Sequence, residues 1–245
     1  MAKTKEEIIN FNNLYTSMHK CKSGVLWKGS VASYYLNGIE NTIRLQDQLI
    51  NGTYQARRPI TFTITSPKRR EILSVAFRDR VYQRALNDNW IYPHVTKGFI
   101  YDNAACQKGK GTDFALKRMK EFLRKAYRKH GQDFYIAKCD IKGYYPNMPH
   151  DRVNNIFKAR LPEEVFERSL KIMQQQYTGD IGYNPGSQMI QIAGIAALDE
   201  IDHYIKEVLR IKWYMRYMDD FILIHQDKAY LEECMQKVKQ KLKSI

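Results

Sequence analysis

Cysteine is scarce in this chain, and its spacing fits neither a metal module nor a disulfide framework. The four cysteines among 245 residues are Cys21, Cys106, Cys139 and Cys234, and no two of them form a C-x-x-C pair. Structural zinc sites and disulfide scaffolds both draw on cysteines at short, repeated spacings. The spacing therefore argues against both, and we expect free thiols in a reducing compartment.

Long hydrophobic runs are also missing. The longest apolar stretch, "MIQIAGIAAL", is well short of the roughly 20 apolar residues that a membrane-spanning helix requires. The first residues, "MAKTKEEIINF", are charged throughout and contain no apolar segment of the kind found in a signal peptide. We therefore expect a cytoplasmic protein with no membrane partner.

Acidic residues are in deficit. The chain has 26 Asp and Glu against 40 Lys and Arg, a net charge of +14, whereas its 44% hydrophobic content is ordinary for a globular protein. An excess of basic residues often forms only a solvated surface, but here the basic residues occur in blocks separated by aromatic residues. That arrangement favours a polyanionic partner, and nucleic acid in particular.

Hydrophobic periodicity predicts a mixture of helices and antiparallel strands. Helical spacing and end signals predict helices at residues 5–20, 31–51, 78–93, 114–129, 149–160, 163–177 and 187–209, and a last helix from residue 228. The period-two alternation in "TFTITSPKRREILSVAF" predicts a hairpin that turns at Ser66-Pro67. A short apolar strand ends at Asp140.

Two adjacent carboxylates, Asp219 and Asp220, lie between apolar segments in "WYMRYMDDFILIH". Residues 213–225 are predicted to form an antiparallel hairpin with both acids at its turn, where Asp is a favoured residue. A solvated turn is the plainest interpretation of such a pair. The strands are almost wholly apolar and the tip carries nothing to pair the charge, which favours a hard cation such as Mg²⁺, bound through one or two carboxylates.

Asp140 is a third candidate ligand. It ends a short strand, and two tyrosines, Tyr144 and Tyr145, follow it at the fourth and fifth positions. Two-metal phosphoryl transfer needs ligands shared between ions about 3.5–4 Å apart. A small antiparallel sheet in which this strand lies beside the hairpin would bring all three acids to one edge.

Four segments in order resemble motifs of the reverse transcriptases. Tyr217-Met218-Asp219-Asp220 resembles their four-residue signature, "CDIKGYYPNMPHDRV" their first palm motif, and "RDRVYQRAL" the finger segment of bacterial members. "PGSQMIQIAGIAALDEIDHYIKE" is similar to the Ser-Gln form of the middle palm motif in retron, diversity-generating and phage-defence relatives. The resemblance covers roughly residues 50–245 and implies an α+β fold, the fingers and palm of a right-hand polymerase with an antiparallel palm sheet packed by helices. It implies an N-terminal helical extension over 1–52, fingers over 53–131 and a palm over 132–245.

The resemblance also implies roles for individual residues. Asp140 and Asp219 would bind two Mg²⁺ ions, for which Mn²⁺ substitutes, with Asp220 supporting the site and the Ile141 backbone adding a ligand. Tyr145 falls at the steric gate that excludes the ribose 2′-OH, although a core tyrosine is the plainer alternative. The other nucleotide-binding candidates are Lys68, Arg69, Arg70, Gly186 and Gln188. The candidates for binding nucleic acid are Arg78, Arg80, Arg84, Lys108 and Lys110.

The chain departs from the family pattern in two places. Many relatives have Pro-Gln-Gly in the middle motif, whereas this chain has Asn184-Pro185-Gly186-Ser187-Gln188, which puts the role of Gln188 in doubt. No segment after residue 245 supplies the later palm motif, the primer grip or the helical thumb, so we expect a truncated palm without a thumb.

These features predict an RNA-directed DNA polymerase that adds dNTPs to a primer 3′-OH. Its expected partners are an RNA template, a DNA primer and product, and dNTPs, and an accessory protein or non-coding RNA is left open. Two alternatives remain at this point. One is a nucleic-acid-binding module with a degenerate or incomplete palm, and the other is an antiphage-defence polymerase that makes untemplated or protein-primed DNA.

Overall fold

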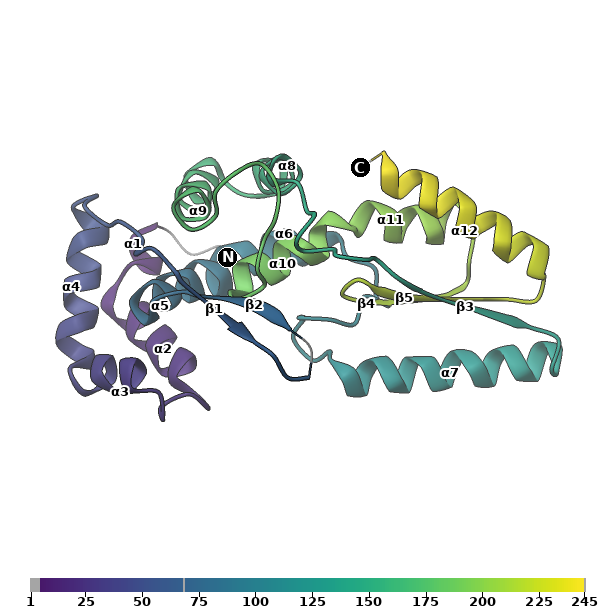
Figure 1. Cartoon of the computed structure of the whole chain (residues 1–245), viewed down its shortest axis with the longest axis horizontal. Coiled ribbons are helices and arrows are strands. Elements are labelled where there is room, and N and C mark those ends of the chain that lie inside the picture. The colour runs from purple at the N-terminus through teal and green to yellow at the C-terminus, as the bar shows by residue number, and fades with distance from the viewer. Residues whose placement is uncertain (1–4, 68, 245) are drawn as a thin grey trace. The chain divides into compact units, whose positions relative to one another are not determined.

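Two discontinuous sets of residues form separate packing units in the computed structural model, which describes residues 5–67 and 69–244 (Figure 1). Unit 1 comprises Met1–Val95 and Pro149–Ile192, and unit 2 comprises Thr96–Met148 and Ala193–Ile245. The contiguous division at residues 52 and 131 inferred from the sequence concerns functional subdomains and stays a prediction. Among the described residues, no helix combines the length and the apolar character needed to cross a membrane.

Unit 1 is mostly helical. Its helices are α1 (Lys5–Ile8), α2 (Phe11–Lys22), α3 (Gly29–Leu36), α4 (Gly38–Ile50), α5 (Phe77–Leu86), α6 (Tyr92–Val95), α8 (His150–Arg160), α9 (Glu163–Gln176) and the first half of α10 (Gln188–Ala197). Apolar residues of α2, α4 and α5 form much of its core, and those without measurable exposure are Leu14, Met18, Leu45, Val81 and Ala85. The apolar residues that helical spacing placed on one side of each predicted helix therefore pack together in the core of unit 1.

Two of the helices predicted in unit 1 are interrupted, and a third continues beyond its predicted end. The predicted helix at 5–20 restarts at Asn10, whose side chain accepts a hydrogen bond from the Asn13 backbone N–H at 2.9 Å and so caps α2. The predicted helix at 31–51 breaks at Asn37, which leaves helical geometry between α3 and α4. The predicted stop near Pro93 is wrong, because a π-helical turn (Asn87–Ile91) leads into α6 and places Pro93 in a first turn, where its missing N–H is tolerated.

The predicted hairpin of unit 1 is confirmed. β1 (Ile60–Ile64) pairs antiparallel with β2 (Arg70–Ser74), with Ile60 opposite Ser74 and Ile64 opposite Arg70. Most of its side chains are exposed, including the apolar Ile60 and Phe62. The hairpin is thus a projecting element with little core of its own.

Unit 2 is built on a three-stranded antiparallel sheet in the order β3-β5-β4. The strands are β3 (Tyr135–Asp140), β4 (Trp213–Tyr217) and β5 (Asp220–His225), and the helices are α7 (Thr112–His130), α11 (Asp199–His203) and α12 (Lys228–Lys243). A 3₁₀ turn (Thr96–Gly98) and a π-helical turn (Tyr204–Val208) complete the unit. The predicted continuous helix at 187–209 is wrong, because the chain leaves helical geometry at Leu198.

Helices cover both faces of this sheet, as Figure 1 shows, with α7 along one face and α11 and α12 along the other. Alternate residues of each strand separate into two clusters. The cluster under α7 contains Phe122, Trp213, Met215 and Ile224, and the cluster under α12 contains Tyr214, Phe221, Leu223, Leu231 and Val238. β4 and most of β5 are buried between these clusters, whereas the edge strand β3 is largely exposed.

Candidate functional site: an acidic edge of the three-stranded sheet

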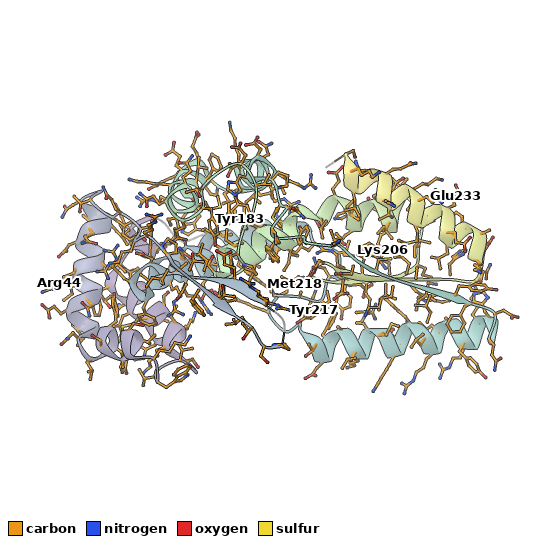
Figure 2. All side chains as sticks on the ribbon, in the orientation of Figure 1. Arg44, Tyr183, Lys206, Tyr217, Met218 and Glu233 are labelled. Carbon is orange, nitrogen blue, oxygen red and sulfur yellow. The ribbon has the colours of Figure 1, made fainter. Side chains whose placement is uncertain are left out.

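A two-residue turn, Met218-Asp219, joins β4 to β5, and Tyr217 and Asp220 form the last pair of the ladder. Figure 2 labels Tyr217 and Met218 at this end of the hairpin. Met218 has a φ of 56°, the left-handed region that non-glycine residues seldom adopt, which is the sign expected for the first residue of a tight hairpin turn. Asp219 therefore lies in the turn, outside the paired residues of the ladder.

The strand of Asp140 lies directly beside this turn. β3 pairs antiparallel with β5, and its last residue, Asp140, is the partner of Asp220. Directly opposed residues of an antiparallel pair project from the same face, so these two side chains share the face that α7 covers farther along. The predicted placement of the Asp140 strand beside the hairpin is confirmed, while the roles of the three acids stay a prediction.

The carboxylates at this edge have no ion-pair partner among the described residues. Within the described part of the chain, no lysine or arginine forms an ion pair with Asp140, Asp219 or Asp220. Burial raises the pKa of the Asp219 carboxyl, and the negative charges of Asp140 and Asp220 raise it further. Carboxylates that repel one another in this way gain when a cation joins them.

The donor set fits Mg²⁺. Hard divalent cations prefer carboxylate oxygens, and Mg²⁺ uses one or two of them with water and substrate phosphates. In the described ranges, no three histidine, cysteine or acidic side chains are arranged to hold one metal ion together. A site that takes part of its ligands from a substrate does not need such a cluster.

Two tyrosines line the loop after β3. The Tyr144 hydroxyl donates to the Gly194 carbonyl of α10 at 2.6 Å, and the rings of Tyr144 and Tyr145 are 5.4 Å apart in an edge arrangement. The Tyr145 hydroxyl is buried without a hydrogen-bond partner among the described residues, and burial raises its pKa. Tyr145 is therefore positioned by packing, and the space beside Gly194 decides where its ring lies.

We expect Gly194→Ala to destabilise the protein only while Tyr145 is present. A Cβ at Gly194 would lie 2.5 Å from the Tyr145 hydroxyl and 2.8 Å from its Cζ, and such overpacking costs about 1–3 kcal/mol. In a protein that already carries Tyr145→Ala, Gly194→Ala should leave the free energy of unfolding unchanged or raise it by up to about 1 kcal/mol, since alanine is the better helix former. Urea unfolding of the two single variants and the double variant measures this coupling.

Gly98→Ala is the control for this cycle, because nothing lies within 4 Å of a Cβ at that position. It should behave alike with and without Tyr145. Equal effects of Gly194→Ala in both backgrounds would contradict the packing described above.

Two other neighbours complete the acidic edge. Ile141 follows Asp140 directly, and its side chain packs against the cluster under α12 while its backbone stays the predicted ligand. The Cys106 sulfur lies 3.7 Å from the Met218 sulfur, beside the turn. Cys106 was not singled out from the sequence, and its single thiol carries no motif that could have indicated it.

The predicted nucleotide-binding residues other than Tyr145 belong to unit 1. Arg69 and Arg70 are exposed where β2 begins, and neither forms an ion pair with any described residue, while Lys68 lies outside the described residues. The loop before α10 lies against β2, since the Asn184 side chain donates to the Glu71 carbonyl at 2.8 Å.

The glycine of this loop is held close to the same strand. A Cβ on Gly186 would come within 2.8 Å of the Leu73 carbonyl oxygen, so this approach requires glycine. The exposed Gln188 begins α10. The structure thus brings β2 and the loop before α10 together.

The three arginines predicted to bind nucleic acid already contact other residues of unit 1. Arg78 contacts Asp79, Gln48 and the Gln55 carbonyl. Arg84 pairs with Asp88 at 2.9 Å, and Arg80 lies over the Phe77 ring. These three side chains contribute to the packing of unit 1, and their contact with nucleic acid stays a prediction.

The two basic candidates of unit 2 occupy the loop before α7. Lys110 donates to the carbonyls of Tyr101 and Asn103 at 2.8 and 3.0 Å, and burial lowers its pKa. Lys108 is exposed. Lys110 therefore serves to tie its own loop together.

Comparison with known proteins gives one family. The family model described as "Reverse transcriptase (RNA-dependent DNA polymerase)" matches residues 65–245, most of the chain. No curated protein matches the sequence.

Two chains of solved structures share the fold at low sequence identity, and a third aligns with a lower score. A chain of a partial Cas6-RT-Cas1–Cas2 complex aligns with a TM-score of 0.53 and 18% identity over 98% of this chain, and a chain of a Cas6-RT-Cas1–Cas2 complex gives the same values. A chain of an apo telomerase from Candida tropicalis, truncated from its C-terminal domain, aligns with a TM-score of 0.48 and 13% identity over 82% of this chain and 51% of its own length. This chain spans only 41% and 26% of the two Cas6-RT-Cas1–Cas2 chains.

Proposed function

Because this chain belongs to the reverse transcriptase family, we propose that it is an RNA-directed DNA polymerase that joins dNTPs to the 3′-OH of a primer. In this assignment residues 132–245 are the palm, whose three acids belong to unit 2, and residues 53–131 are the fingers, whose tip is the β1–β2 hairpin of unit 1. The single observation behind the proposal is the pairing of Asp140 with Asp220 beside the Asp219 turn, at one end of the three-stranded sheet.

The three aspartates act as a preorganised negative site. Asp140 and Asp219 are the proposed ligands of both ions, with Asp220 and the Ile141 backbone in support. Two Mg²⁺ ions, when bound, supply activation of the primer hydroxyl and neutralisation of charge on the phosphates. The protein contributes position, because β3 and β5 hold two of the acids in register and the turn places the third.

Other residues select and hold the nucleotide. Tyr145 is proposed to lie under the sugar, where a flat ring leaves no room for a 2′-OH. Arg69 and Arg70, with Lys68, are proposed to grip the triphosphate, because a guanidinium donates two parallel hydrogen bonds to phosphate oxygens. Gly186 and Gln188 would line the nucleotide pocket.

The excess of basic residues supports the choice of partners. A net charge of +14 attracts the phosphate backbones of an RNA template and a DNA primer, with an affinity that falls steeply with salt. The Ser187-Gln188 form of the middle motif supports a bacterial or phage type of reverse transcriptase. An accessory protein or a non-coding RNA is a further partner under this proposal.

The test is primer extension on an RNA template of mixed sequence with all four dNTPs and Mg²⁺ or Mn²⁺, followed by sequencing of the product. Complementary DNA is the expected product. A homopolymer or a protein-linked product would instead indicate an untemplated or protein-primed polymerase. No incorporation, together with retained RNA binding, would indicate a nucleic-acid-binding module.

We expect replacement of Arg69 and Arg70 by alanine to raise the KM for dNTP about tenfold or more, since one lost charged hydrogen bond is worth at least about 1.4 kcal/mol. The fold should be unaffected, because both side chains are exposed. Steady-state kinetics at saturating primer–template measures the change. Arg44→Ala is the control, since Arg44 is an exposed arginine paired with Glu40 on α4 (Figure 2), and an equal KM change in that variant would contradict the fingertip role.

A further inference from the structure

A buried arginine lies two residues before the acidic turn, on the opposite face of β4 from Tyr217. Arg216 is 1% exposed, and its partner Asp202 in α11 is 0% exposed. The Arg216 Nε and Nη2 atoms donate to the two carboxylate oxygens of Asp202 at 2.7 and 2.6 Å. Burying such a pair has a large desolvation cost, and an apolar pair of similar volume often stabilises a protein equally well.

The rest of the guanidinium reaches the turn itself. Nη1 donates to the Met218 carbonyl at 2.8 Å, and Nη2 also donates to the Ile195 carbonyl of α10 at 3.0 Å. The Met218 carbonyl belongs to the peptide group that leads into Asp219. Fixing this carbonyl fixes the plane of the peptide group that precedes Asp219. Met218 itself has a φ of 56°, which is intrinsically unfavourable for a non-glycine residue.

Further hydrogen bonds hold both Asp202 and the backbone of Arg216. The Tyr214 hydroxyl donates to Asp202 at 2.6 Å, so the carboxylate is oriented by a second side chain. The Arg216 backbone N–H donates to the Asp102 carbonyl at 3.1 Å, and its carbonyl accepts from the Ala104 N–H at 2.8 Å. The Met218-Asp219 turn is therefore the part of the hairpin that depends on the guanidinium for its geometry.

We infer that Arg216, anchored by Asp202, is a positioning residue that sets the orientation of Asp219 through the Met218 carbonyl. The inference rests on the proposed function, in which Asp219 is a metal ligand. Residues that orient a ligand without touching the metal commonly change metal affinity by about 10–100-fold. Arg216 acts in this way on a ligand's main chain.

Arg216→Lys tests the inference, because an ammonium keeps the charge opposite Asp202 but lacks the planar fork that also reaches Met218. We expect Mn²⁺ binding, measured by electron paramagnetic resonance, to weaken about tenfold or more. The metal concentration for half-maximal primer extension should rise in parallel, with little change in the KM for dNTP. Arg168→Lys is the control, since Arg168 pairs with Glu164 and contacts the Tyr82 hydroxyl in unit 1, and its Mn²⁺ binding should stay at the wild-type value.

A second variant separates position from stability. Arg216→Met, Asp202→Leu and Tyr214→Phe together remove the charge pair and the hydroxyl bonded to it, so the palm should unfold at a temperature near that of the wild type. Its Mn²⁺ affinity should nevertheless fall as in Arg216→Lys. Wild-type Mn²⁺ affinity in Arg216→Lys, or in a triple variant that is folded, would overturn the inference.

Failure of the proposed function gives a different result. If the wild type binds Mn²⁺ through Asp219 but extends no primer, the polymerase assignment fails, and the Mn²⁺ comparison still decides the role of Arg216. If Mn²⁺ binding is absent from the wild type, or is unchanged in Asp219→Asn, both proposals are wrong.

Discussion

Asp219→Asn is expected to abolish nucleotide incorporation while the protein stays folded. The change keeps the size of the side chain and removes its charge, so the fold loses nothing that packing supplies. Metal-ion stabilisation of charge is worth several kcal/mol, which corresponds to a loss in rate of roughly a thousandfold or more. Single-nucleotide primer extension with Mg²⁺ and with Mn²⁺ measures it.

The control is Asp133→Asn, an exposed aspartate in the turn before β3 that takes part in no side-chain hydrogen bond or ion pair within the described residues. It should be as active as the wild type. Wild-type activity in Asp219→Asn would remove the acidic edge from the reaction and leave the function to be found elsewhere in the chain.

Asp219→Asn should be at least as stable as the wild type when no metal is added. Burial, Asp140 and Asp220 raise the pKa of Asp219, so the folded state holds this proton more tightly than the unfolded chain does. Ionised Asp219 therefore destabilises the fold as pH rises through the interval from its ordinary pKa to the raised one. The advantage of Asp219→Asn should be present at neutral pH and vanish below that interval, which thermal unfolding from pH 3 to pH 7 would follow (about 3.9 being the ordinary value).

Added Mg²⁺ should reverse the order. An ion that binds only the folded state raises the unfolding temperature of the wild type but has no complete site in Asp219→Asn. A variant that is less stable than the wild type without metal would show that the carboxylate has a structural role.

The acidic edge could be predicted from the sequence because each part of it is local. Asp140 ends an apolar strand, and Asp219 and Asp220 interrupt two apolar runs that can only form a hairpin, so the sheet that joins them has few alternatives. The order β3-β5-β4 and the pairing of Asp140 with Asp220 confirm that placement.

Other features depend on contacts between distant segments and left little trace in the sequence. Hydrophobic periodicity continues across both Leu198 and Pro93, so it indicated neither the break at the first nor the continuation of the helix through the second. Arg216 is the clearest case. A single arginine in an apolar strand looks like an edge residue until its partner 14 residues earlier in the chain, Asp202, is known to be buried beside it.

Tyr145→Ala is expected to weaken the discrimination between dNTPs and rNTPs. The ring is half-buried, and its hydroxyl makes no hydrogen bond within the described part of the chain, so its effect on a substrate would come from its volume. Removing that volume leaves room for a 2′-OH, and pockets that discriminate by a small group commonly do so by roughly tenfold or more. We therefore expect the ratio of kcat/KM for rNTP to kcat/KM for dNTP to rise by at least about tenfold, even where the total rate falls.

Tyr145→Phe is the matched control for this change. It keeps the flat ring and removes only the unbonded hydroxyl, so the ratio of rNTP to dNTP use should stay at the wild-type value. Single-turnover extension with each nucleotide on the same RNA template gives both ratios and separates them from any change in primer binding. If Tyr145→Ala leaves the ratio unchanged, the ring serves only to pack against Gly194. If Tyr145→Phe changes the ratio as much as Tyr145→Ala does, the hydroxyl rather than the volume of the ring controls the choice of sugar.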